Sequence, residues 1–187
     1  MDRTEIKNLV SDSFKKMFEN DYCFKFTENE EDERAATYRY MRNDLEAKGI
    51  VNIRVFLSYT FSRDGKTFKP DILICSHSGD KKNVKNINAE ALVEMKNWPN
   101  KDEIKRDLDK LINYRKRLEL DNPLLFFCGI LDKDIKKNQI EHYKNELAAL
   151  KPEYSHIEII LFTHSGSYVG PWNSKKKTDP WREKFRK

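Results

Sequence analysis

Two apolar, β-prone runs in this chain carry charged side chains at positions that a buried strand normally excludes. Residues 69–74 read KPDILI and include Asp71, whereas residues 91–96 read ALVEMK and include Glu94 and Lys96. An uncompensated carboxylate or ammonium in an apolar strand costs several kcal/mol, and a divalent metal ion would supply the compensation. Because side chains alternate between the faces of a strand, Glu94 and Lys96 point the same way. If the two runs are neighbouring strands, two carboxylates and a lysine converge on one point of a sheet.

The Pro-Asp pair of the first run and the Glu-Met-Lys triplet of the second resemble the active-site motif of the PD-(D/E)XK nucleases, the restriction-endonuclease-like superfamily. The resemblance covers residues 33–163. It implies a metal-dependent phosphodiesterase, a DNA endonuclease of restriction, defence or repair type, that uses Mg²⁺ and accepts Mn²⁺. It further implies that Asp71 and Glu94 hold the metal, together with the backbone carbonyl of Met95.

The resemblance assigns roles to two further side chains. Lys96 would orient the attacking water or stabilise negative charge in the transition state, since the neighbouring acids hold its pKa too high for a base. Glu33, in a helical segment that also resembles the family, would serve a second metal ion; the alternative is an ordinary acid at a helix N-terminus. For Asp71, Glu94 and Lys96 together, the alternative is a solvent-facing row of ion pairs.

Nucleic-acid contacts are predicted on both sides of the triplet. Lys110 and Tyr114 lie on the helix that follows it, and Lys81 and Lys82 lie in the polar loop that precedes it. Ordinary solvated surface is the alternative for each of them. Residues 175–187 hold seven basic and two acidic residues, so their charge equals the net charge of +5 of the whole chain. Such a tail would bind phosphates or simply keep the protein in solution.

Composition predicts one domain, residues 1–174, followed by this basic tail. The chain is 38% hydrophobic and 36% charged, and its apolar runs are shorter than a membrane helix requires. Its three cysteines are odd in number and widely separated, which is typical of reduced thiols. The N-terminus shows no signal-peptide pattern. We therefore expect a cytoplasmic protein that does not bind membranes.

The elements that must position these residues follow from periodicity and turn signals. The sequence predicts helices over 4–19 (capped by Thr4) and from the acidic cluster at 28–33 to Gly49, strands over 52–61 and 68–76 around an Asp-Gly hairpin turn, a strand over 88–96, a helix over 101–118, a buried strand over 124–131, a helix over 135–150 and a last strand over 157–163. This order predicts an α/β fold with a mixed sheet flanked by helices. The family resemblance implies a restriction-endonuclease-like αβββαβ core.

The partner implied is nucleic acid, double-stranded DNA in the first instance, with RNA and single strands left open. Enzymes of this fold often act as homodimers, and a chain this short leaves little room for a recognition domain, so a targeting partner protein is a second hypothesis. The alternative function is a non-catalytic nucleic-acid-binding module on a nuclease-like fold, because fold alone does not fix function.

Overall fold

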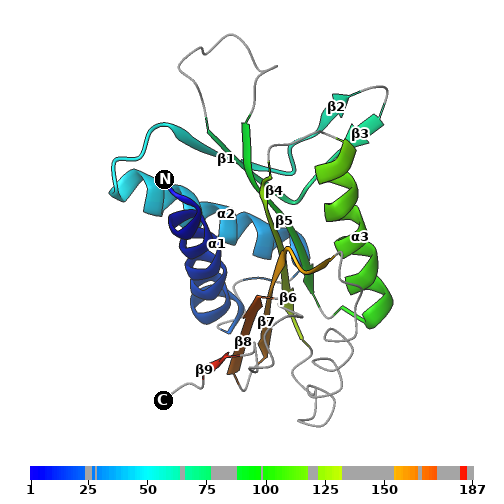
Figure 1. Ribbon diagram of the computed structural model, residues 1–187. Coiled ribbons are helices and arrows are strands. Elements are labelled where there is room, and N and C mark those ends of the chain that lie inside the picture. The colour runs from blue at the N-terminus through cyan, green and yellow to red at the C-terminus, as the bar shows by residue number, and fades with distance from the viewer. Residues whose placement is uncertain are drawn as a thin grey trace.

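Seven strands between residues 53 and 184 join one mixed sheet, and helices pack on both of its faces (Figure 1). The computed structural model describes residues 1–23, 27, 29–63, 66–76, 88–97, 99–117, 122–131, 154–163, 166–171 and 182–184. The elements in chain order are α1 (Arg3–Met17), the π-helical η1 (Phe18–Tyr22), α2 (Glu30–Ala47), β1 (Ile53–Leu57), β2 (Phe61–Arg63), β3 (Lys66–Phe68), β4 (Ile72–Ser76), β5 (Asn88–Asn97), α3 (Lys101–Arg117), β6 (Leu124–Ile130), β7 (Ile157–Thr163), β8 (Gly166–Pro171) and β9 (Arg182–Lys184).

The main sheet has the strand order β1-β4-β5-β6-β7-β8-β9 among the described residues. Its centre is parallel, because β6 runs parallel to both β5 and β7. Both flanks are antiparallel, with β1, β4 and β5 on one side and β7, β8 and β9 on the other. The mixed α/β fold predicted from the sequence is confirmed.

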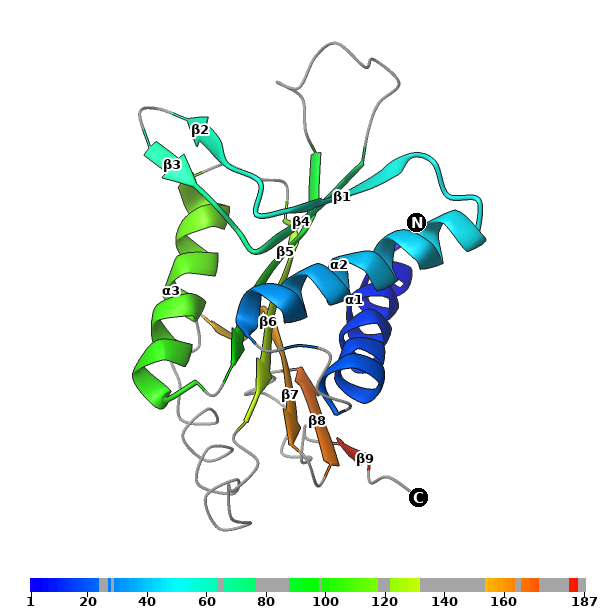
Figure 2. The same ribbon diagram turned by 180° about the vertical axis from the view of Figure 1, so that it is seen from behind.

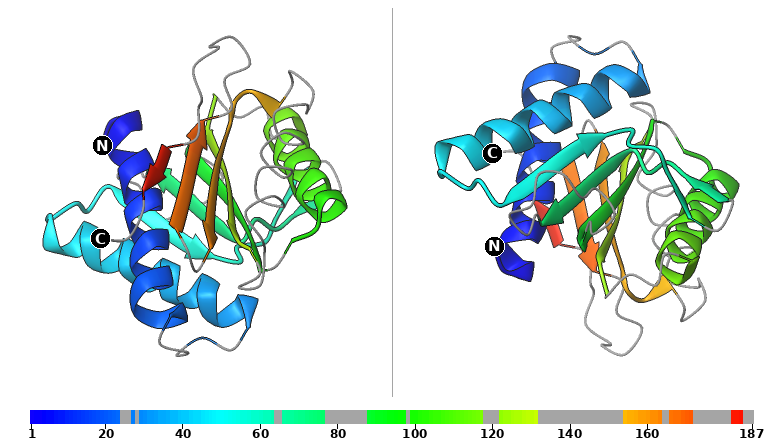
Figure 3. Two further views of the ribbon diagram at one scale, coloured as in Figure 1. Left: turned by 90° about the horizontal axis from the view of Figure 1, so that it is seen from below. Right: turned by 90° about the horizontal axis from the view of Figure 1, so that it is seen from above.

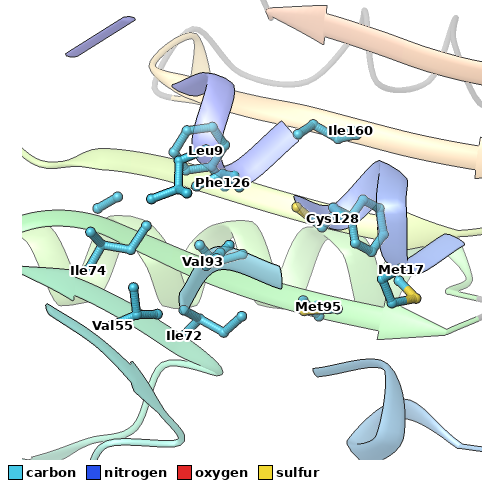
Figure 4. Packing of buried hydrophobic residues seen from close by; sticks show 14 of the residues in the cluster. Leu9, Met17, Val55, Ile72, Ile74, Val93, Met95, Phe126, Cys128 and Ile160 are labelled. Atoms are coloured by element: carbon cyan, nitrogen blue, oxygen red, sulfur yellow. The ribbon is translucent and has the colours of Figure 1, made fainter. Parts of the chain in front are cut away.

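The sheet separates two apolar cores. On one face, α1 and α2 pack against side chains such as Val93 and Phe126, and Figure 4 shows part of this cluster. On the other face, α3 packs against Leu92 and Phe127. Figure 2 and Figure 3 show the two helical layers from further sides. Every residue of β6 is buried, as predicted for a central strand covered on both faces.

The hairpin of β2 and β3 projects beyond the main sheet beside α3 (Figure 1, Figure 2). One strand was predicted over 52–61, but the chain leaves β1 at Ser58, which has a positive φ of 48°. Each predicted strand therefore reaches into two sheets: β1 pairs with β4 in the main sheet, and β2 pairs with β3 in a separate two-stranded sheet. The antiparallel hairpin pairing itself is confirmed.

The start of α1 also differs from the prediction. Asp2, and not Thr4, caps the helix, since its carboxylate accepts the Glu5 N–H at 2.8 Å. In return, Glu5 Oε2 accepts the Asp2 N–H at 2.7 Å, which completes a capping box. Gly49 ends the α2 region with a φ of 64°, as its predicted stop position requires.

The sheet continues beyond the strand predicted to be the last. β8 follows β7 and pairs with it, and β9 adds residues 182–184 of the basic tail to the sheet edge. The predicted helix over 135–150 and the rest of the tail lie outside the described residues. None of the helices in the described ranges combines the length and the apolar character that crossing a membrane requires.

Candidate active site

Asp71 lies immediately before β4, and its backbone is fixed there because its carbonyl accepts the Ser58 N–H at 2.8 Å. Its side chain is buried and accepts two hydrogen bonds. The Met95 backbone N–H donates to Oδ2 at 2.7 Å, and Arg34 Nη1 donates to Oδ1 at 2.7 Å. The carboxylate therefore connects β4 to β5 and to α2, which brings three elements together at one point.

The β4–β5 register brings Glu94 next to Asp71. Ile72 is paired with Val93, so the next position outward on each strand holds one of the two acids. Their charges act on each other: burial, and then the charge of Asp71, raises the pKa of Glu94 from 4.5 to about 9. Two carboxyl groups thus share a poorly solvated site, where ionising both at once has a high free-energy cost.

Glu94 is almost fully buried, with 1% of its surface exposed. Its Oε2 accepts a hydrogen bond from Lys110 Nζ of α3 at 2.5 Å. Its Oε1 is buried and has no hydrogen-bond partner within the described part of the chain. A buried carboxylate oxygen without a partner is costly, so this atom has free capacity for a ligand.

Lys96 lies on the same face of β5 as Glu94, two residues further along the strand. Its ammonium pairs with Oε2 of Glu30, the first residue of α2, at 3.1 Å. Partial burial lowers the pKa of Lys96, but the contact with Glu30 outweighs it, so the pKa is raised above its ordinary value. Lys96 is therefore a positive charge at neutral pH and not a proton acceptor.

Glu33 of α2 contacts the last residue of β5. Its Oε1 accepts a hydrogen bond from Asn97 Nδ2 at 2.8 Å, and only 2% of Glu33 is exposed. Burial, and then the charges of Glu30 and Asp32, raises the pKa of Glu33 from 4.5 to about 8. The described hydrogen bond of Glu33 goes to Asn97, and Glu30 is the α2 acid that pairs with Lys96. The predicted metal role of Glu33 stays a prediction.

The predicted nucleic-acid contacts on α3 face inward toward Glu94. Lys110 pairs with Glu94, and its ammonium lies 5.8 Å from the centre of the Tyr114 ring. Tyr114 is buried, packs edge-on against Phe68, and accepts the Lys69 N–H at 3.3 Å. Lys81 and Lys82 lie outside the described residues.

Three residues to which the sequence assigned no role also contribute to this site. Arg34 holds Asp71, Glu30 holds Lys96, and Asp107 of α3 lies among the site charges. Burial raises the pKa of Asp107, whereas the charges of Lys110 and Lys96 lower it. Asp107 precedes Lys110 by three positions, a helical spacing that places both on one face; this was the signal available in the sequence.

The donor set fits a hard divalent cation held by few protein ligands. Among the described residues, no group of three or more His, Cys, Asp or Glu side chains could hold a metal ion. Mg²⁺ does not need such a group, because it keeps several waters and often takes only one or two carboxylates. Asp71 and Glu94 supply that pair, and the partnerless Oε1 of Glu94 is the atom that a cation would satisfy.

Comparisons with protein-family models, with curated proteins and with solved structures found no significant match to this chain. Any assignment of function therefore depends on the geometry of this site.

Proposed function

We propose that this chain is a metal-dependent nuclease that hydrolyses phosphodiester bonds, with Asp71, Glu94 and Lys96 as its active site. The observation that carries the proposal is the buried Glu94 carboxylate, which has one oxygen without a partner beside a second carboxylate. Arg34 and Lys110 compensate part of the cost of burying the two acids. Oε1 of Glu94 stays unsatisfied, and this remaining cost is better explained by function than by stability.

The order of the strands supports a restriction-endonuclease-like core as part of the proposal. α2 precedes an antiparallel meander of β1, β4 and β5, and α3 then connects β5 to the parallel strand β6. This is the αβββαβ succession that the motif resemblance implies. Asp71 precedes β4 and Glu94 lies in β5, where Arg34 of α2 and Lys110 of α3 contact them.

Asp71 and Glu94 would hold Mg²⁺ or Mn²⁺, with the backbone carbonyl of Met95 as a further ligand. When bound, such an ion supplies a more acidic water and a polarised phosphate. The protein's own residues do the rest. The hydrogen bonds from Met95 N–H and Arg34 fix the direction of the Asp71 carboxylate, and Glu30 holds Lys96 charged at the edge of the site.

Lys96 would stabilise the negative charge that develops on the phosphoryl oxygens and orient the attacking water. A preorganised positive charge in a poorly solvated site is worth far more than the same charge in water. The proposed substrate is double-stranded DNA, cut internally. The charge of the chain favours this polyanionic class, because the net charge is +5.

The test is cleavage of supercoiled plasmid, linear duplex, single-stranded DNA and RNA with Mg²⁺, Mn²⁺ or EDTA. We expect cation-dependent cutting that falls by more than about 100-fold in Asp71→Asn and in Lys96→Met. Lys105→Met is the matched control, since Lys105 is an exposed lysine of α3, and it should cut like the wild type. Cutting that survives Asp71→Asn would contradict the proposal.

A second function is favoured by one observation. Both acids already hold basic partners, since Arg34 bonds Asp71 and Lys110 bonds Glu94. A fold that had exchanged its cation for these side chains would be a non-catalytic nucleic-acid-binding module. Salt-sensitive binding without cleavage, unchanged in Asp71→Asn, would support this alternative.

A further inference from the structure

The contact between Lys110 and Glu94 is the shortest ion pair of the candidate site. Its two members differ strongly in burial. The Lys110 Nζ lies 2.5 Å from Glu94 Oε2, and 36% of the lysine side chain is exposed against 2% of the glutamate side chain. The ammonium therefore lies between a buried carboxylate and the surface. Its positive charge is bound to one oxygen of the carboxylate whose other oxygen, Oε1, is available to a cation.

We propose that Lys110 and a divalent cation compete for Glu94, so that Lys110 is the counter-ion of the metal-free protein and must be displaced when the cation binds. This inference rests on the proposed function, because it takes the Asp71–Glu94 pair to be the cation site. An ammonium and a divalent ion on one carboxylate repel each other strongly when little water separates them. Occupation by one therefore opposes occupation by the other.

The surroundings of Lys110 provide for its displacement. Its side chain is long and partly exposed, so it can change direction without leaving a cavity in the core. Asp107 lies one turn earlier on the same face of α3, and its carboxylate interacts with the charges of both Lys110 and Lys96. A displaced ammonium thus keeps an acidic neighbour, and its exposed end can also contact a phosphate of the substrate.

Arg34 is a different case. Its Nη1 bonds Asp71 Oδ1, while Met95 N–H bonds Oδ2. The guanidinium is planar and cannot lose its charge, so it orients the carboxylate more firmly than an ammonium would. We assign the competition to Lys110 alone, and we assign to Arg34 the positioning of Asp71.

The experiment is calorimetric titration of the metal-stripped, full-length protein with MnCl₂ and with MgCl₂. Lys110→Met keeps the aliphatic stem without the charge, and Lys110→Gln keeps a neutral donor in case the methionine variant does not fold. We expect the dissociation constant to fall at least about tenfold in both variants. Lys105→Met, which removes the same charge from an exposed position on α3, should stay within about twofold of the wild type.

Melting temperature gives a second readout that needs no catalysis. Without metal, Lys110→Met should melt below the wild type, because Glu94 loses its partner, and Mn²⁺ should raise its melting temperature more than it raises that of the wild type.

If the wild type and both Lys110 variants bind Mn²⁺ with equal affinity, the competition is overturned while the nuclease proposal stands. If neither the folded wild type nor the folded variants bind a divalent ion, the cation site is absent, and both proposals fail.

Discussion

Two buried glutamates lie near the end of β5, and they have different partners. Glu94 faces α3 and shares its site with Asp71 and Lys110. Glu33 comes from α2 and has a neutral partner, the side-chain amide of Asn97. Both have raised pKa values, but only Glu94 has an unsatisfied oxygen next to a second acid. The metal role of Glu33 stays a prediction, because its described contact is to a neutral amide.

Glu33 leads to a prediction about stability and pH. The unfolded chain ionises this side chain above pH 4.5, whereas the folded protein keeps it neutral up to about pH 8. Folding must therefore take up a proton in this window, so the contribution of Glu33 to stability is fully present below pH 4.5 and is lost as the pH rises toward 8.

Glu33→Gln removes this titration and retains an acceptor for Asn97. We expect a gain in the free energy of unfolding that grows from pH 5 to pH 8 and reaches the order of 1–3 kcal/mol, measured by urea denaturation at several pH values. Glu31→Gln is the control, because Glu31 is exposed on the same helix. A gain that does not change with pH would contradict this account.

At this scale, the alternation of side chains along β5 was sufficient to predict that Glu94 and Lys96 share a face. It could not reveal that Lys110 pairs with Glu94 or that Glu30 pairs with Lys96. Those contacts depend on how α3 and α2 cross the sheet, and helix crossing depends on three-dimensional packing that no local spacing specifies.

At the level of elements, the N-terminus of α2 contacts two residues of the proposed active site. Asn29 caps this helix by accepting the N–H groups of Glu31 at 2.9 Å and Asp32 at 3.0 Å. The next residue, Glu30, reaches Lys96, and Arg34 reaches Asp71 one turn later. Fraying of this first turn would release the contact between Glu30 and Lys96.

We therefore expect Asn29→Ala to lower the free energy of unfolding by about 1 kcal/mol and also to weaken cleavage, because Lys96 loses its support. Chemical denaturation and the plasmid assay measure the two effects. Asn29→Asp, which preserves the cap, is the control and should change neither. Full activity in a destabilised Asn29→Ala protein would show that the first turn of α2 does not position Lys96.

The helices were easier to predict than the strands. All three described α-helices agree with their predicted ranges within a few residues, because their apolar stripes are long. The region from 52 to 76 was harder: two continuous β-prone runs hide the break at Ser58, where a single positive φ sends the chain into a separate hairpin. Propensity does not show which of two sheets a strand will join.

On the scale of the whole molecule, neighbouring residues of one central strand pack into two different apolar cores. Phe126 and Phe127 are neighbours in β6, yet the first belongs to the α1–α2 core and the second to the α3 core. Both are essentially inaccessible to solvent, at 1% and 0% exposed. Because one strand supports both layers, the two cores should unfold together.

Phe126→Leu and Phe127→Leu test this expectation. Each should destabilise the protein by on the order of 1 kcal/mol, and far- and near-ultraviolet circular dichroism should report a single shared transition in both variants. Val51→Ala, at a residue that is 88% exposed, should leave the transition unchanged. Separate transitions for the two layers would show that the cores are independent.

The buried centre of the sheet was predicted, but its far edge was not. β8 reads GSYVGP, with glycine and proline at three of its six positions, and such residues normally count against a strand. Its pairing with β7 overrides that local preference. β9 lies in the basic tail, for which the sequence predicted positive charge but no strand.

The parallel pairing of β6 has a consequence for how the protein is made. Leu124 pairs with Ala91, and Leu125 pairs with Ile157, so each ladder must close a loop of about thirty residues before it gains a bond. During synthesis β6 therefore leaves the ribosome well before its second neighbour exists. Until β7 follows, this edge of β6 has no partner strand, and unpaired edges with exposed apolar side chains promote aggregation.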